Sequence, residues 1–207
     1  MNINYWKEVH KIKFPNSNDS SSMPWDTNRH DINLETGLKF LNLEQGEVLE
    51  LGCGVGNDAS YLSNLGFNVD AIDINPYFIN KAKKKNLNVN FICGNVFENL
   101  PQKKYDLIYD RGFLHNVPHV YYSNIFNLLK SRLNDKGYLI LITGHPAPEK
   151  DLTPIPTPTP YYEIILGFKD LFNIKMIKEI NFELNENFGV REGIIYILKP
   201  LNINKLC

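Results

Sequence analysis

Short apolar runs alternate with longer amphipathic stretches through the middle of the chain. The apolar runs predict strands at residues 48–52, 68–73, 89–93, 105–110 and 138–143. The stretches between them have helical periodicity and predict helices at residues 57–65, 76–85 and 121–133. Strands and helices that alternate at this spacing are typical of a parallel, doubly wound α/β sheet.

The two ends of the chain differ from this regular centre. Before it lies an appendage of residues 1–30, and Asp31 is expected to cap a helix that runs to Leu43. After it, residues 144–162 carry six prolines, and a stiffened loop of this length suits a lid. A helix at about 162–172 and strands at 174–183 and 191–198 are expected to follow. The short turn from Asn185 to Gly189 makes these last strands antiparallel neighbours.

Composition narrows the range of partners. The formal net charge of −1 gives no overall electrostatic case for nucleic acid or for an anionic membrane. The lysines between Lys81 and Lys85 are interpreted as the solvated face of a helix. No run of about 20 apolar residues is present, and Met1–Lys13 lacks the core of a signal peptide. We therefore expect no membrane and no nucleic acid as partner.

The three cysteines, Cys53, Cys93 and Cys207, form no Cys-x-x-Cys pair. This usage favours a reducing, cytoplasmic setting and argues against a structural metal. We expect a monomer or a weak homodimer.

The stretch from Val48 to Asp58 carries the most informative motif. An apolar strand meets Gly52, Gly54 and Gly56 at alternate positions and passes into a helix. Glycine lets the backbone approach a ligand closely, and the N–H groups at the start of the helix offer donors to it. The third glycine of the dinucleotide fingerprint would stand at position 57, which is Asn57. The phosphate-binding half of a dehydrogenase site is thus incomplete.

Three further motifs follow in order. Asp73 ends the second strand 21 residues after Gly52, Gly94-Asn95-Val96 follows the third strand, and Tyr105-Asp106-Leu107-Ile108 opens the fourth. Together with Glu50-x-Gly52-x-Gly54-x-Gly56, this series over residues 45–145 resembles the class I S-adenosylmethionine-dependent methyltransferases. The resemblance implies a single domain with a Rossmann-like, doubly wound, seven-stranded α/β sheet, mostly parallel with a C-terminal antiparallel hairpin. Its parts would be a cover segment (1–30), a cofactor-binding core (31–143), a proline-rich loop (144–162) and a C-terminal helix and strand pair (163–207).

The same resemblance implies how S-adenosyl-L-methionine would be bound. Gly52, Cys53 and Gly54 would line its methionine and ribose, and Asp73 would accept the ribose hydroxyls. Asp73 as a helix N-cap ahead of Pro76 is the structural alternative. Ile74 would pack on the adenine. Asn95 stands where the family usually has an aspartate that bonds the adenine amino group, with Val96 beside it. Glu50 and Asn57 complete the implied cofactor site.

Two features are similar to the branch that contains thiopurine and other thiol methyltransferases. Pro24-Trp25-Asp26 precedes the core, and in that branch an N-terminal tryptophan segment closes over the methionine end. Asp110-Arg111-Gly112 leaves the fourth strand like the substrate-side loop of that branch. The alternative for Trp25 is plain core packing.

The carboxyl ends of the fourth and fifth strands supply the catalytic candidates Asp110, Arg111, His115 and His145. Arg111 is expected to bind the cofactor carboxylate or an anionic acceptor, with Asp110 beside it. The alternative for Arg111 is a salt bridge with Asp110 or Asp26. His115 and His145 are the candidate bases, because oxygen and amine acceptors usually need one.

A thiolate acceptor needs little help of this kind. The sequence therefore predicts methyl transfer to a small-molecule thiol or other soft nucleophile, with S-adenosyl-L-homocysteine as product. Two alternatives stay open: a cofactor-binding regulatory or interaction module without turnover, and a nicotinamide-dependent oxidoreductase.

Overall fold

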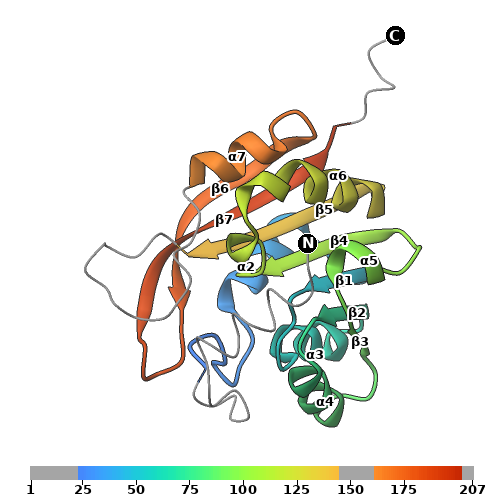
Figure 1. Cartoon of the computed structure of the whole chain (residues 1–207), viewed down its shortest axis with the longest axis vertical. Helices are drawn as coiled ribbons and strands as arrows, with labels where there is room; N and C mark the ends of the chain where they lie inside the picture. Colours follow the sequence, from blue (N-terminus) through green and yellow to red (C-terminus); the bar gives the residue numbers. More distant parts are fainter. Residues whose placement is uncertain (1–22, 145–160, 202–207) are drawn as a thin grey trace.

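A seven-stranded sheet forms the centre of the molecule in the computed structural model, which describes residues 23–144 and 161–201 (Figure 1). Its strand order is β3-β2-β1-β4-β5-β7-β6. The first five strands are parallel, and β7 is antiparallel to both β5 and β6. The strands are β1 (Glu47–Leu51), β2 (Asn68–Asp73), β3 (Asn90–Cys93), β4 (Tyr105–Arg111), β5 (Leu133–Gly144), β6 (Phe172–Glu183) and β7 (Val190–Pro200). The predicted fold class is confirmed.

Helices cover both faces of this sheet and give the molecule three layers. They are α2 (Ile32–Leu41), α3 (Asn57–Asn64), α4 (Pro76–Lys85), α5 (Val96–Asn99), α6 (Tyr122–Arg132) and α7 (Tyr161–Phe168), with 3₁₀ turns η2 (Leu114–Asn116) and η3 (His119–Tyr121). One face packs against α2, α3 and α4, and the other against α5, α6 and α7. Within the described ranges, no helix is long and apolar enough to cross a membrane.

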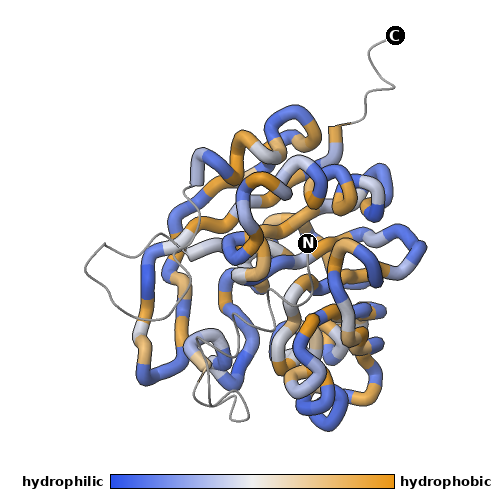
Figure 2. The backbone as a smooth tube through the Cα atoms, in the orientation of Figure 1, coloured by the Kyte–Doolittle hydropathy of each residue, from blue (hydrophilic) through white to orange (hydrophobic). Residues whose placement is uncertain are grey.

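The alternation of side chains along each central strand explains why both faces are covered. On β1, Leu49 and Leu51 join the apolar cluster under α6, whereas Val48 joins the cluster under α3. Such strands are apolar on both sides, as expected for a parallel sheet that is buried between helices. Figure 2 shows this hydrophobic centre, with polar residues concentrated on the outer helices and loops.

Three elements differ from those predicted. β5 begins at Leu133 rather than at 138, because Leu133 already pairs with Tyr105 before an irregularity shifts the register. α7 ends at Phe168 rather than near 172, since Phe172 pairs with Pro200 as the first residue of β6. The short helix α5 was not predicted, because its four residues are too few to show a helical period.

Asp31 caps α2 as predicted, and its side chain accepts the N–H of Asn33 at 2.7 Å. The predicted turn between the last two strands is also confirmed, because the Phe188 N–H donates to the Asn185 carbonyl within it. The rest of the predicted cover segment (1–22) and most of the proline-rich loop (145–160) lie outside the described residues.

Candidate active site

A cavity opens at the carboxyl ends of the parallel strands, beside β1 and β4. The strand order reverses between these two neighbours, and ligands of open α/β sheets bind at such a switch point. The glycine loop after β1, the residues after β2 and the segment 23–30 line one part of the cavity. The loop after β4 and the β6–β7 turn region line the other part. We call these the cofactor half and the acceptor half.

The glycine loop has left-handed backbone at all three glycines, with φ of 60° at Gly52, 52° at Gly54 and 74° at Gly56. A Cβ on Gly52 would lie 2.8 Å from the Phe113 Cβ, and one on Gly56 would lie 2.7 Å from the Phe91 ring. At Gly54 the nearest atom to such a Cβ would be 3.8 Å away, on Trp25. Gly52 and Gly56 are therefore required by packing, whereas Gly54 leaves room for a ligand.

Cys53, between these glycines, lines the cavity with a buried thiol. Burial and the nearby Glu50 carboxyl raise the pKa of this thiol well above its usual range. Cys53 is thus a neutral thiol rather than a nucleophilic thiolate.

Asp73 ties the glycine loop to the end of β2. Its carboxylate accepts the N–H of Gly54 at 2.9 Å and the N–H of Asn75 at 2.8 Å. The helix that begins at Pro76 is capped by Asn75, which accepts the N–H of Tyr77. The N-cap alternative for Asp73 is therefore wrong. Each oxygen keeps lone pairs that ribose hydroxyls can use.

Asn95, which occupies the position of the usual aspartate, caps α5. Its side-chain oxygen accepts the N–H of Phe97 at 3.0 Å, and its Nδ2 donates to Glu98 at 3.0 Å. The residue still lines the cavity together with Ile74 and Val96, whose side chains offer an apolar wall for a base. The role of Asn95 toward adenine stays a prediction, and its amide nitrogen is already engaged.

Glu50 is buried at the floor of the cavity, with 4% of its surface exposed. Its Oε2 has no hydrogen-bond partner among the described residues. Burial and the nearby Asp58 carboxyl raise the pKa of Glu50 well above its usual range, which disfavours its charged form.

Arg111 belongs to a buried network at the boundary between the two halves. Its guanidinium pairs with Asp31, donates to the Glu183 carbonyl and lies over the Phe182 ring at 4.7 Å from the centroid. Asp31 in turn donates its backbone N–H to Asp58 at 2.7 Å. The alternative of a salt bridge with Asp110 or Asp26 is wrong about the partner, which is Asp31. The sequence did not indicate this pair because Asp31 and Arg111 are far apart in the chain. The predicted contact of Arg111 with cofactor or acceptor stays a prediction.

Asp110 serves the loop that follows β4. Its two oxygens accept the N–H groups of Phe113 and Leu114 at 2.8 and 2.9 Å, and Asp110 is not among the residues that line the cavity. Burial raises the pKa of Asp110 to about 7 against these two N–H bonds. The structure thus gives Asp110 a task in folding the loop, and its catalytic and cofactor-binding roles stay untested predictions.

His115 lines the acceptor half, and the N–H of Gly144 donates to its Nδ1 at 3.3 Å. Burial and the charge of Arg111 lower the pKa of His115 to about 4. The ring is therefore neutral near pH 7, with its proton on Nε2 and its Nδ1 lone pair engaged by Gly144, and the low pKa makes His115 a weak base. The other predicted base, His145, lies outside the described residues.

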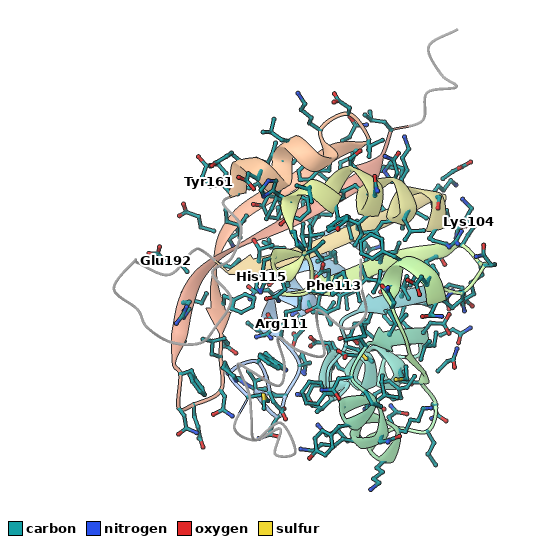
Figure 3. The ribbon with its side chains drawn as sticks, viewed as in Figure 1. Lys104, Arg111, Phe113, His115, Tyr161 and Glu192 are labelled. Carbon is teal, nitrogen blue, oxygen red and sulfur yellow. The ribbon has the colours of Figure 1, made fainter. Side chains whose placement is uncertain are left out.

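Figure 3 shows Arg111, Phe113 and His115 gathered at the carboxyl end of β4, with Lys104 at the opposite end of that strand. Trp25 and Asn57 also line the cavity, and their binding of the cofactor stays a prediction. Prediction from sequence missed further lining residues: Asp26, Phe78, Asn116, Phe182, Leu184 and Arg191. Of these residues, Asp26 lies in a motif that the sequence analysis noted, Pro24-Trp25-Asp26. The others lie outside the noted motifs, in elements that the fold brings to the cavity.

The sheet with its closing antiparallel pair, the glycine loop and the acid at the end of β2 define an α/β protein of the nucleotide-cofactor class. The chain belongs to the methyltransferase domain family, whose model matches residues 25–187. This match confirms the resemblance to class I S-adenosylmethionine-dependent methyltransferases. The nicotinamide-dependent oxidoreductase alternative is set aside.

Two relatives illustrate the range of this similarity. The ubiquinone biosynthesis O-methyltransferase of Rickettsia bellii (strain OSU 85-389) is 29% identical over 164 residues, which are 72% of this chain and 65% of that protein. The probable S-adenosyl-L-methionine-dependent methyltransferase TehB of Haemophilus influenzae (strain KW20) is 30% identical over 148 residues, 69% of this chain and 49% of that protein. The chain thus spans about half to two thirds of the length of these relatives.

Solved structures share the fold. An S-adenosylmethionine-dependent methyltransferase from Anabaena variabilis matches with a TM-score of 0.72 at 17% identity, over 97% of this chain and 96% of that one. A TehB-like methyltransferase from Corynebacterium glutamicum matches with a TM-score of 0.65 at 15% identity, over 96% and 97%. At these identities the likeness establishes the architecture alone.

Proposed function

We propose that the protein transfers the methyl group of S-adenosylmethionine to a small molecule, and that this acceptor is a thiol or another soft nucleophile. The observation that carries the proposal is the composition of the cavity. A polar cofactor half adjoins an acceptor half in which the described histidine is neutral and acts as a donor.

The residues of the cofactor half fit S-adenosylmethionine. The missing side chain at Gly54 leaves space under Trp25, and the buried Asp26 Oδ2 and Glu50 Oε2 have no partner among the described residues. When bound, this cofactor supplies an electrophilic methyl group on a positively charged sulfur. Asp73 would accept the ribose hydroxyls, and Ile74 and Val96 would pack against the adenine.

Aromatic faces suit the positive sulfur. Trp25, whose ring meets Phe78 edge to face at 6.3 Å between centroids, lies above the glycine loop. Phe113 packs against Gly52 from the opposite element. Cation–π attraction of this kind contributes about 0.5–2 kcal/mol. These residues would orient the methyl group toward the acceptor half.

The described residues in and around the cavity favour an acceptor that is already nucleophilic without a protein base. His115 offers an Nε2–H, Asp110 is bonded to its own loop and Cys53 is a neutral thiol. A small thiol ionises near pH 8.5, so part of it is thiolate at neutral pH without a protein base. Positioning alone then supplies most of the catalysis, on the order of 7–11 kcal/mol.

The test is release of S-adenosylhomocysteine from S-adenosylmethionine across matched thiols, phenols and amines, with wild type and His115→Gln. Turnover of thiols by both proteins, within about tenfold of each other, is the expected result. Turnover confined to phenols or amines, and reduced about 10²–10⁴-fold in His115→Gln, would show that His115 is a base.

An oxygen acceptor is the second candidate, because one relative is named an O-methyltransferase. Phenol turnover in the same panel would favour it over the thiol. A protein that binds S-adenosylmethionine but turns over none of the panel would favour the regulatory or interaction module.

A further inference from the structure

Asp26 is a buried carboxylate whose interactions within the described residues leave one oxygen unused. Only 1% of the residue is exposed, and it lines the cavity. Its Oδ2 has no hydrogen-bond partner among those residues. A buried carboxylate oxygen without a donor is costly, so such atoms are rare in folded proteins. Its position at the cavity points to a ligand that completes the pairing.

The other carboxylate oxygen is firmly held. Oδ1 accepts the N–H of Asn28 at 3.2 Å and the Nδ2 of Asn57 at 3.1 Å. The side chain of Asn57 cannot turn freely, because its own oxygen accepts the Lys85 Nζ at 2.7 Å. The backbone carbonyl of Asp26 accepts from the Asn185 side chain at 3.1 Å. The orientation of Oδ2 is therefore set before any ligand arrives.

The location of Asp26 indicates which part of a cofactor would reach it. It follows Trp25, whose ring lies over Gly54, and it is bonded to Asn57 at the first turn of α3. The Gly54 N–H is bonded to Asp73, the expected ribose residue. Asp26 thus lies beside the glycine loop and next to Trp25, whose segment the resemblance places over the methionine end of the cofactor.

We propose that Asp26 binds the α-ammonium group of S-adenosylmethionine through Oδ2. This inference rests on the proposed function and adds a binding residue to its site. An ammonium group supplies three N–H donors with a positive charge, and a charge-assisted bond to a carboxylate is about twice as strong as a neutral one. The adenine amino group is neutral and would lie at the wall formed by Ile74 and Val96.

Glu50 is the competing partner, because its Oε2 also lacks a partner among the described residues. Burial and Asp58 raise the pKa of Glu50 well above its usual range, which disfavours its charged form. A neutral carboxyl group binds an ammonium more weakly than a carboxylate does. The raised pKa of Glu50 therefore counts against it as the ammonium partner.

The experiment measures binding by titration calorimetry for wild type, Asp26→Asn and a control variant. The three probes are S-adenosylmethionine, S-adenosylhomocysteine and 5′-methylthioadenosine, which lacks the amino acid part. Asp26→Asn is expected to weaken the first two about 10- to 100-fold and to change the third by less than about twofold.

The control variant is Asp106→Asn. Asp106 accepts one backbone N–H, from Glu47 at 3.0 Å, and one asparagine Nδ2, from Asn134 at 2.7 Å. It therefore makes the same kinds of bond as Asp26, at the opposite end of the sheet. Affinities for all three probes are expected to stay within about twofold of wild type.

Unchanged affinity of Asp26→Asn for S-adenosylmethionine would overturn the inference, and so would an equal loss for methylthioadenosine. If Asp26→Asn does not fold, the wild-type protein is tested with a second ligand, an analogue of S-adenosylhomocysteine that lacks the α-amino group. Wild type should bind this analogue about 10- to 100-fold more weakly than S-adenosylhomocysteine. Equal binding of the two ligands would overturn the inference. Failure of wild type to bind any probe would instead contradict the proposed function.

Discussion

The two halves of the cavity are held together in different ways. In the cofactor half, the glycine loop, Asp73 and Asn75 lie within one stretch of chain and are joined mainly through backbone N–H groups. In the acceptor half, Arg111 reaches Asp31 and Glu183, which are 80 and 72 residues away in sequence. The glycine loop and the end of β2 therefore depend on local backbone conformation, whereas the Arg111 network depends on side chains that join distant segments.

The largest expected effect is at the link between the halves. Arg111→Met leaves the buried Asp31 carboxylate without its cation, and breaking such a buried pair lowers the free energy of unfolding by about 3–5 kcal/mol. Chemical denaturation measures this loss. The double variant Asp31→Asn/Arg111→Met should recover part of it. A loss below about 1 kcal/mol in the single variant would mean that distant pairing does not hold the acceptor half.

Within the cofactor half, Gly56→Ala and Gly54→Ala form a matched pair. Both place a side chain at positive φ, but only the first also meets the Phe91 ring. We expect Gly56→Ala to lower the free energy of unfolding by about 2–4 kcal/mol and Gly54→Ala by about 1–2 kcal/mol, measured by denaturant titration. Equal losses would contradict the assignment of Gly56 to packing.

Asp73→Ala tests the ligand role of the cofactor half. We expect binding of S-adenosylmethionine to weaken by about 1–3 kcal/mol, because the ribose loses a hydrogen-bonded charged acceptor. Calorimetry should show a similar loss for 5′-methylthioadenosine, which keeps the ribose. A loss confined to ligands with the amino acid part would remove Asp73 from the ribose.

The end of β4 and the loop after it carry two groups, His115 and Asp110, whose titrations oppose each other. His115 has a pKa lowered to about 4, so it destabilises the folded protein as pH falls below the usual value near 6.5. Asp110 has a pKa raised to about 7, so the folded protein gains stability as pH falls from that value toward the usual one near 4. The two contributions nearly cancel in the wild type.

Single variants should separate these contributions. As pH falls from about 7 to about 5.5, Asp110→Asn should lose about 1 kcal/mol of its own unfolding free energy, because only the opposing contribution of His115 remains. His115→Gln should gain about as much over the same range. Thermal or denaturant unfolding at several pH values measures both slopes. If the unfolding free energies of the two variants change with pH in the same direction, the opposing pKa shifts of Asp110 and His115 are contradicted.

The smallest effect is expected at the cavity rim. Arg29 pairs with Glu183 at 2.7 Å, but 65% of its side chain is exposed. Arg29→Ala should therefore lower the free energy of unfolding by about 0.5 kcal/mol or less. A loss as large as that of Arg111→Met would show that the rim also supports the acceptor half.

The sequence predicted the cofactor half better than the acceptor half for the same physical reason. The strands, the glycine turn and the Asp31 cap follow from residues close in sequence, and the structure contains all of them. The Asp31 partner of Arg111, the Gly144 N–H on His115 and the position of Phe182 depend on which distant segments the fold brings together. Periodicity and motifs carry no information about such pairs.

The central claim is that the described residues of the acceptor half supply no effective general base, and a matched pair of acceptors tests it most directly. Thiophenol and phenol share one ring and differ in the attacking atom and its acidity. We predict release of S-adenosylhomocysteine with thiophenol in wild type and in His115→Gln, and little with phenol. Turnover of phenol that exceeds that of thiophenol and is lost in His115→Gln would contradict the account.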